Sequence, residues 1–403
     1  MTAQDVTVVI PAHNAAATIG RALASVTSPL VREIVLVDHA SADATVKLAR
    51  THTRRPLRVV QAAAEEMLGG VRQRGLESVA TPYGVWLDAD DEYLAGRVER
   101  LRSRLHAGAD LVADAAELQD AHGARRTLAI AAFLQRPGGW VRLFERNYLP
   151  GPGVIAFRTK VLLATGYDSG QHGPEDTDAL LRSLDAGARL AFEPTPGYRI
   201  HASPTSISRD MGNQRAMYRA LLSKHDPAHV HARYIEAGWP ERVAWWARHS
   251  MAVFKADLDE AEHCLLAIEG VRDDVRPEEV VEPDGPQPFT ERWRFAFATG
   301  TLALLRGLGP EALHQLQSAA QARDCAEGAN NLGIALARCG DLSAARKQFA
   351  RAIADRPGYV DALLNLEAGA PARITSHPFR VHDNRIEYVL PDSMLAADQH
   401  VRP

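Results

Sequence analysis

Two kinds of hydrophobic pattern alternate along the first ninety residues of the chain. Short apolar runs rich in β-branched residues predict buried strands, and runs whose apolar residues recur every three or four positions predict helices. We expect strands at residues 6–10, 33–38, 57–62 and 83–88, and helices at residues 16–26, 42–51 and 68–80. This alternation is typical of βαβ units, so the fold class is α/β, with a mostly parallel sheet covered on both faces.

The strand pattern stops near residue 212, and the remaining periodicity is helical. The best-defined segment, residues 326–359, has the spacing of the 34-residue tetratricopeptide repeat, carried by Leu332, Gly333, Ala345, Phe349, Ala352 and Pro357. The same offsets occur 33 residues earlier at Gly300, Ala312, Leu316 and Ala319, and a fainter copy surrounds Ala261 and Leu265. The pattern predicts a short array of helical hairpins.

These patterns divide the chain into three parts. We expect an α/β domain at residues 1–212, a helical domain at residues 213–370 and a tail at residues 371–403 that holds a small hairpin around Asp383 and Asn384. Residues 273–292, rich in proline and acids, predict an exposed loop. A helical array offers a surface for a protein or peptide partner, or for a homodimer, and the alternative is a simple buttress for the first domain.

The composition narrows the class of protein. The 403 residues are 46% hydrophobic and 24% charged, and the formal net charge of −4 makes nucleic acid an unlikely partner. We expect no transmembrane segment, because no window approaches 18 uninterrupted apolar residues, and no signal peptide. The three cysteines, Cys264, Cys325 and Cys339, lack metal-ligand spacing. We therefore predict a cytoplasmic protein and leave peripheral membrane association open.

Polar residues follow three of the predicted strands. His13 and Asn14 follow the first, Asp38 ends the second, and the stretch "VWLDADDEY" places Asp88 and Asp90 after the fourth. In parallel sheets ligands bind beyond the carboxyl ends of the strands. Carboxylates there are suitable ligands for Mg²⁺ or Mn²⁺, and a divalent cation would relieve their mutual repulsion.

The two acids that come next have a simpler interpretation. Asp91 and Glu92 precede the helical pattern of "EYLAGRVERLRSRL". Acidic residues are favourable in the first turn of a helix, so this pair is expected at least as much to start that helix as to bind a ligand.

Four motifs together resemble a family-2 glycosyltransferase with the GT-A fold: "VVIPAHNAAATIGRALASV", "IVLVDHASADATVKLA", "VRQRGLESVATPYGVWLDADD" and "GPEDTDALLRSLDAGARLAFEP". They occur in the family's order over residues 5–210. The resemblance implies transfer of a sugar from a nucleotide-sugar donor, by default a UDP-sugar, usually with inversion. Metal dependence on Mn²⁺ or Mg²⁺ is implied as well.

The resemblance also implies roles for individual residues. The donor nucleotide would contact Pro11, Ala12, His13, Asn14, Asp38, Arg72, Asp88 and Ala89. Asp90, the second acid of the D-x-D motif, would ligate the metal, and His201 would complete the metal site. Asp176 would be the general base that takes the proton of the acceptor hydroxyl, with Glu175 orienting the acceptor. Capping of the following helix is the alternative for both acids.

Some positions depart from the family pattern. His39 replaces an acid and Ala40 a glycine in "VDHAS", which puts the base contact in doubt, while Gln73 stands where asparagine is common. The added Arg74 is equally consistent with a solvated helix charge.

Two further segments have open roles. Trp140 and Tyr148, in an aromatic-rich segment, could stack on an acceptor or pack in the core. Residues 207–215 could form a flap over the donor.

The main hypothesis is a metal-dependent inverting glycosyltransferase. Its acceptor is a glycan, a lipid-linked sugar or a polypeptide, and the helical repeats raise the last option. One alternative is an inactive scaffold that binds a protein partner through the repeats. A nucleotidyltransferase is a weaker alternative, because no Gly-rich phosphate loop with Arg or Lys follows the first strand.

Overall fold

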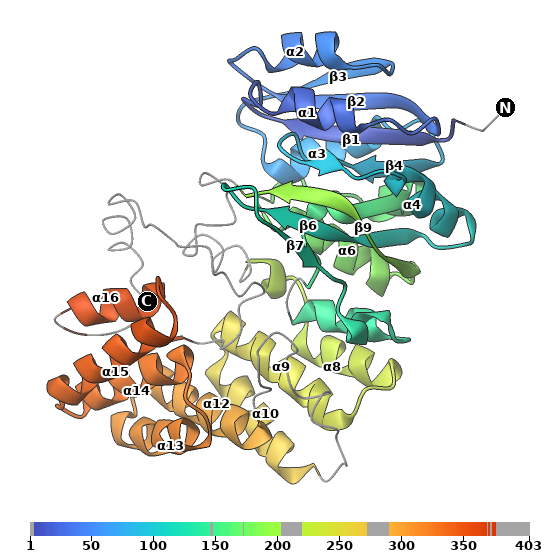
Figure 1. Ribbon diagram of the computed structural model, residues 1–403. Coiled ribbons are helices and arrows are strands. Elements are labelled where there is room, and N and C mark those ends of the chain that lie inside the picture. The colour runs from blue at the N-terminus through green and yellow to red at the C-terminus, as the bar shows by residue number, and fades with distance from the viewer. Residues whose placement is uncertain are drawn as a thin grey trace. The chain divides into compact units, whose positions relative to one another are not determined.

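The computed structural model describes residues 4–145, 148–171, 173–202, 220–271, 290–368, 370 and 373–375. The chain divides into two compact units, one of residues 1–143 with 147–221 and one of residues 144–146 with 222–403 (Figure 1). The first contains a sheet with flanking helices, and the described part of the second is helical. The predicted order, an α/β domain followed by helices, is confirmed.

The first unit is built on one mixed sheet with the strand order β3-β2-β1-β4-β8-β6-β9-β5, with β7 paired to β6. The bounds are β1 Val6–Ala12, β2 Val31–His39, β3 Leu57–Ala62, β4 Tyr83–Trp86, β5 Glu92–Tyr93, β6 Leu111–Gln119, β7 Arg125–Leu128, β8 Ile155–Arg158 and β9 Leu190–His201. The strands β1 to β4 are parallel, as the sequence predicts. Beyond β4 the pairings are antiparallel except for β6 with β9, so the sheet is less uniformly parallel than expected.

Both faces of the parallel half are covered. Consecutive residues of β1 and β2, whose side chains point to opposite faces, are fully buried: Val8, Val9 and Ile10, and Val35, Leu36 and Val37. The helices of this unit are α1 Ile19–Ser25, α2 Thr45–His52, α3 Leu68–Glu77, α4 Arg97–His106, α5 Thr159–Thr165 and α6 Glu175–Asp185, with 3₁₀ turns η1 Ala132–Gln135, η2 Gly139–Phe144 and η3 Pro152–Val154. The carboxyl ends of the parallel strands and the start of α6 therefore frame the predicted site.

The second unit is formed by α8 Pro227–Glu236, α9 Glu241–Lys255, α10 Leu258–Gly270, α12 Glu291–Leu305, α13 Gly309–Ala322, α14 Ala326–Arg338, α15 Leu342–Asp355 and α16 Val360–Glu367. Four of these helices begin with a side-chain oxygen that accepts a hydrogen bond from a main-chain N–H, at Asp226, Asp257, Thr290 and Asp341. Such N-caps satisfy amide groups that the helix leaves without an acceptor.

Two consecutive hairpins of this unit share one packing arrangement. A methyl group on Gly300 of α12 would lie 2.7 Å from Leu316 of α13, and one on Gly333 of α14 would lie 2.5 Å from Phe349 of α15. Glycine is required at both positions because the helices approach too closely for a side chain. The equivalence follows the 33-residue offset seen in the sequence, while the tetratricopeptide assignment itself stays a prediction.

Three predicted features lie outside the described residues: the flap at 207–215, most of the loop at 273–292 and the hairpin around Asp383. In the described part of the chain, no helix combines the length and the apolar character needed to cross a membrane.

Candidate active site

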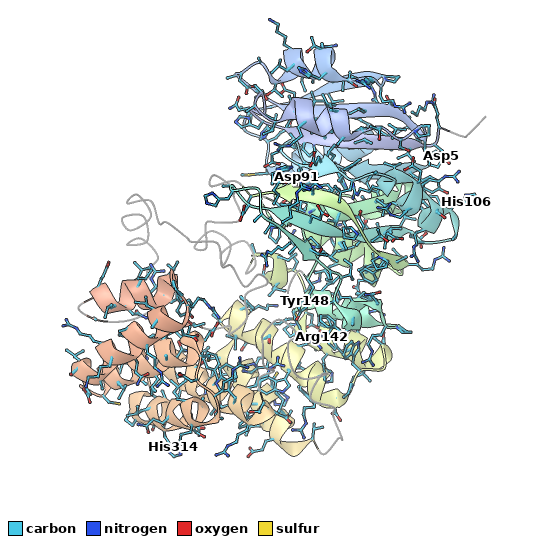
Figure 2. The ribbon with its side chains drawn as sticks, viewed as in Figure 1. Asp5, Asp91, His106, Arg142, Tyr148 and His314 are labelled. Carbon is cyan, nitrogen blue, oxygen red and sulfur yellow. The ribbon has the colours of Figure 1, made fainter. Side chains whose placement is uncertain are left out.

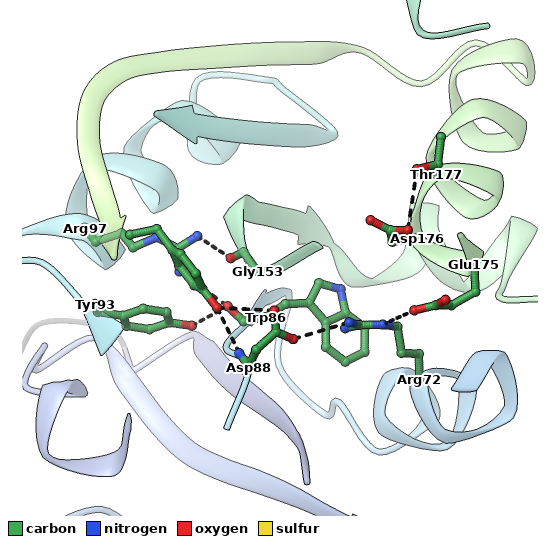
Figure 3. A network of polar contacts seen from close by, with 10 residues as sticks. Arg72, Trp86, Asp88, Tyr93, Arg97, Gly153, Glu175, Asp176 and Thr177 are labelled. Carbon is green, nitrogen blue, oxygen red and sulfur yellow. Dashed lines mark hydrogen bonds and ion pairs between the residues drawn. The ribbon is translucent and has the colours of Figure 1, made fainter. Parts of the chain in front are cut away.

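Arg72 joins the two acidic motifs of the first unit. It lies on α3 and is almost fully buried, as is Glu175 at the start of α6. Arg72 donates from Nε to Glu175 Oε1 at 2.7 Å and from Nη2 to Asp88 Oδ1 at 3.3 Å (Figure 3). Burial alone would lower the pKa of the guanidinium, but Asp88 and Glu175 outweigh it and raise that pKa. A permanently charged arginine thus holds the two carboxylates together.

Asp176 lies beside this network without joining it. It is half-buried in the first turn of α6, where Thr177 Oγ1 donates to it at 3.5 Å. Desolvation, followed by repulsion from Glu175, raises the pKa of Asp176 to about 6. A carboxylate with such a pKa is a better proton acceptor near neutral pH than an ordinary aspartate. The N-cap of α6 is Pro174, with no side-chain hydrogen bond, so the geometry leaves both acids available for other roles.

A second set of contacts, deeper in the core, fixes the position of Asp88. Its main-chain N–H donates to the hydroxyl of Tyr198 at 3.0 Å, and that hydroxyl donates to Asp88 Oδ2 at 3.4 Å. The Arg97 guanidinium lies over the rings of Tyr93 and Tyr198, 4.3 and 4.8 Å from their centroids. It also makes a bidentate ion pair with the fully buried Asp114, at 2.8 and 3.0 Å.

Asp91 and Glu92 do not start the next helix, which corrects the interpretation made from the sequence. Helix α4 begins only at Arg97, after Gly96 with a φ of 72°. Glu92 is instead part of β5. The buried Asp91, labelled in Figure 2, accepts a hydrogen bond from the main-chain N–H of His201 at 2.9 Å. The acid that sequence reasoning set aside therefore anchors the end of β9 beside the D-x-D segment.

The carboxylates of this segment repel one another. Desolvation by the surrounding protein, and then the charge of Asp88, raise the pKa of Asp90. The same causes, with Asp90 added, raise the pKa of Asp91 well above its usual range. Arg21 of α1 donates to the main-chain carbonyl of Asp90. Arg21 lies within the first motif quoted from the sequence, but nothing in that motif indicated this contact.

His201, predicted to complete a metal site, lies at the end of β9. Its Nε2 atom is buried and accepts no hydrogen bond from the described residues, and it lies 3.4 Å from Glu92 Oε1. Burial, and then the charge of Arg21, lower the pKa of the imidazole, which favours the neutral form that binds metals. Within the described ranges, no three His, Cys, Asp or Glu side chains form a ready-made metal cluster. Asp90 and His201 nevertheless fit a hard divalent cation in their chemistry.

Five of the eight predicted nucleotide residues, Pro11 to Asn14 and Asp38, lie where β1 and β2 end. Pro11 and Ala12 close β1, and His13 Nδ1 donates to the His39 carbonyl at 2.6 Å while His13 Nε2 accepts from Asn14 Nδ2 at 3.0 Å. This pattern is that of a neutral imidazole. Asn14 Oδ1 also accepts from Ala42 N at 2.9 Å, which ties the two strand-end loops together.

Three polar atoms around these strand ends lack a partner. They are Asp38 Oδ1, His39 Nε2 and Arg72 Nη1, each buried and without a hydrogen bond to any described residue. Buried polar atoms are normally satisfied, so such orphans need an explanation, and a ligand is one. Ala40 adopts a φ of 48°, the left-handed region that favours glycine, so the loop keeps a conformation that its residue type disfavours.

The surroundings of the remaining sequence candidates can be described one by one. Gln73 Oε1 accepts from the main-chain N–H of Tyr167 at 2.7 Å, and the exposed Arg74 pairs with Glu66 at 2.7 Å. Ala89 is buried between the two acids of its motif. Trp140 is half-buried on η2, and the Tyr148 ring lies edge-on to Phe133 at 4.8 Å. Their acceptor role stays a prediction.

Comparison with known proteins gives the family. The model described as glycosyl transferase family 2 matches residues 7–163. Two Rhizobium meliloti (strain 1021) proteins are similar. Succinoglycan biosynthesis protein ExoO is 29% identical over 229 residues, 51% of this chain and 63% of its own length. Succinoglycan biosynthesis protein ExoU is 31% identical over 242 residues, 56% of this chain and 69% of its own length. The chain belongs to glycosyl transferase family 2.

Solved structures include similar chains as well. S. aureus TarS 1-349 in complex with UDP-GlcNAc aligns at 12% identity and a TM-score of 0.49, over 87% of this chain and 91% of that one. The complex with UDP aligns at 14% identity and a TM-score of 0.46. The glycosyltransferase class predicted from the motifs is confirmed by family 2 membership, and the α/β fold class is the one the sheet shows.

Proposed function

We propose that this family 2 protein is a metal-dependent, inverting glycosyltransferase that uses a nucleotide-sugar donor, with a UDP-sugar as the first choice. The observation that carries the proposal is the bridge of Arg72 between Asp88 and Glu175. It links Asp88, the first acid of the D-x-D motif, to Glu175, the neighbour of Asp176. This link supports a single site in which the proposed donor-binding groups and the proposed base lie together.

The donor would occupy the ends of β1, β2 and β4. Asp38 Oδ1 and His39 Nε2 supply one acceptor and one adaptable ring nitrogen for a base or ribose, and Arg72 Nη1 supplies a charged donor for a phosphate. Asp88, held in place by Tyr198, completes this surface. With an imidazole where the family commonly has an acid, His39 would relax the choice of base, which the donor screen below addresses.

The acceptor hydroxyl would lose its proton to Asp176. Its raised pKa matches that task, while the neighbouring Glu175 is kept on Arg72 and contributes orientation. A divalent cation, Mn²⁺ or Mg²⁺, held by Asp90 and His201 would stabilise the charge that develops on the departing nucleoside diphosphate. Inversion requires only one such base, which is consistent with this arrangement.

A glycan is the acceptor we favour. Both curated relatives are named for succinoglycan biosynthesis, which supports a growing polysaccharide over the other options. A lipid-linked sugar and a polypeptide are the alternatives.

The test is a donor-hydrolysis screen over nucleotide sugars with Mn²⁺, Mg²⁺ or EDTA. We expect one donor to be cleaved in a metal-dependent way, and Asp176→Asn to lose transfer to an added acceptor glycan while still binding the nucleotide. Asp185→Asn, at the far end of the same helix, is the matched control and should retain activity. Undiminished transfer by Asp176→Asn would remove it as the base.

A scaffold without catalysis is the second candidate, favoured only by the size of the helical unit. Titration calorimetry with UDP, GDP and CDP, each with and without Mn²⁺, separates the two. Absence of any metal-dependent binding would sink the transferase proposal and leave the scaffold.

A further inference from the structure

Three asparagines of the helical unit form a buried polar surface, here called the asparagine face. Asn330 and Asn331 lie on α14 and Asn365 on α16, and all three side chains are at most 1% exposed. Carboxamides buried this deeply must find hydrogen-bond partners. Most of those partners are main-chain groups of a short segment that follows α16, residues 373–375.

The pairing with this segment is regular. Asn331 accepts from the Thr375 N–H and donates to the Thr375 carbonyl, both at 2.9 Å. Asn365 likewise accepts from the Arg373 N–H at 2.9 Å and donates to the Arg373 carbonyl at 3.0 Å. Each of these two carboxamides therefore bonds both the N–H and the C=O of a single residue. The two residues bonded in this way, Arg373 and Thr375, are two positions apart in the sequence. In an extended chain these groups point to one side, so the asparagine face imitates a neighbouring β-strand.

Side chains of the segment add a short sequence preference. Ile374 packs against the hydrophobic core of the helical unit. The Thr375 hydroxyl donates to Asp361 Oδ2 at 3.0 Å and contacts the Tyr359 hydroxyl, while Asn330 Nδ2 donates to it at 3.2 Å. The surface therefore fits an apolar residue followed by threonine, or by serine with the same hydroxyl. The main chain makes the other contacts, which are independent of sequence.

We propose that the asparagine face is a binding site for an extended peptide of a partner protein, and that residues 373–375 of this chain occupy it in cis. Here four of the contacts are paired main-chain hydrogen bonds of the kind by which sheets recognise an added strand. The partner would carry an apolar residue and Thr or Ser in extended form and would compete with the cis segment.

The experiment tests whether residues 373–375 compete with an added peptide for the asparagine face. The full chain with Thr375→Pro loses the N–H that Asn331 accepts, which weakens the cis segment without touching the helices. A fluorescein-labelled peptide with the sequence of residues 370–378 is titrated and followed by anisotropy. We expect the Thr375→Pro chain to bind it about tenfold or more tightly than the unaltered chain, whose own segment acts as a tethered competitor.

Two controls isolate the asparagine face. A peptide N-methylated at the threonine nitrogen lacks one donor and is expected to bind about tenfold more weakly. The second substitution Asn331→Leu, added to Thr375→Pro, is expected to abolish binding. Equal binding of the methylated and unmodified peptides would overturn the proposal, as would a Thr375→Pro chain that binds no better than the unaltered one.

A measurement on the unaltered chain tests the proposal even if the Thr375→Pro variant does not fold. Hydrogen exchange at the Thr375 amide should accelerate when unlabelled peptide is added in excess, because the cis segment is displaced. An unchanged exchange rate would mean that the segment is a fixed part of the fold and would refute the proposal. Because no donor sugar is present in either assay, neither result depends on the transferase function.

Discussion

Arg72 and Glu175, separated by 103 positions in the sequence, form a buried ion pair with 2.7 Å between Nε and Oε1. Each side chain is only 4% exposed. Two charges removed from water in this way are tolerated only because they meet each other, and the loss of one leaves the other without a partner. The pair therefore fixes the position of α6, and with it Asp176, relative to the ends of the strands.

Arg72→Met is expected to lower the free energy of unfolding by about 3–5 kcal/mol, because Glu175 would stay buried without its counter-charge. Arg74→Met on the same helix is the matched control, since Arg74 is exposed and water screens its pair with Glu66, so its loss should change stability little. Urea denaturation of both variants measures the difference. Similar losses for the two would mean that the buried pair does not stabilise this unit.

The pH dependence of catalysis tests the role of Asp176. Its pKa of about 6 belongs to the free protein, so kcat/KM should fall as the pH drops through 6 and reach roughly a tenth of its plateau near pH 5. The sign follows because the base must be ionised to accept a proton. A profile that stays flat down to pH 5 would contradict this role.

The parallel half of the sheet could be predicted from the sequence because its strands are uninterrupted apolar runs. The other half could not, because β6 carries Asp114 and β9 carries Pro194 and Pro196, which break the strand pattern. Asp114 is tolerated only through its ion pair with Arg97, a partner 17 positions earlier on α4. An acid inside the apolar run "LVADAAEL" was still a signal, of the same kind that identified Asp88.

The candidate site, too, could be predicted only in part from the sequence. The motifs located Asp88, Glu175 and Asp176, but motifs carry no information on second-layer contacts such as the hydroxyl of Tyr198 on Asp88. The start of the helix after the acids was misplaced because Gly96, in a left-handed conformation, delays it. The glycine in that stretch is compatible with a turn, but its left-handed conformation could not be read from the sequence.

Asp176 should also cost stability at neutral pH. Its folded-state pKa is raised, so the native state binds more protons than the unfolded state between about pH 4 and 6, and stability falls as the pH rises through that window. Asp176→Asn removes the disfavoured charge. We expect the variant to melt about 2–4 °C above the parent at pH 8. The difference should shrink at pH 5, and calorimetry at both pH values checks it. A variant that melts lower at pH 8 would refute the assignment.

Tyr198→Phe removes the hydroxyl that accepts from the Asp88 N–H. Tyr93→Phe is its control, because the Tyr93 hydroxyl is also buried but donates to the Trp86 carbonyl instead, at 2.8 Å. Each variant is expected to lose about 1–2 kcal/mol of stability. Only Tyr198→Phe should lower kcat/KM, by about tenfold or more, since it alone loosens Asp88. Equal kcat/KM for the two variants would show that this hydroxyl does not position the acid.

Close packing in the helical unit can be tested separately. Gly333→Ala places a methyl group where Phe349 already lies, 2.5 Å away, and a rigid ring inside a core cannot yield cheaply. We expect a loss of about 1–3 kcal/mol, measured by thermal unfolding followed by circular dichroism. Gly270→Ala at the end of α10 has open space around it and should be neutral or slightly stabilising. Adding Phe349→Leu to Gly333→Ala should recover part of the loss, since a smaller side chain makes room for the methyl group. A Gly333→Ala variant as stable as Gly270→Ala would show that α14 and α15 do not depend on this contact.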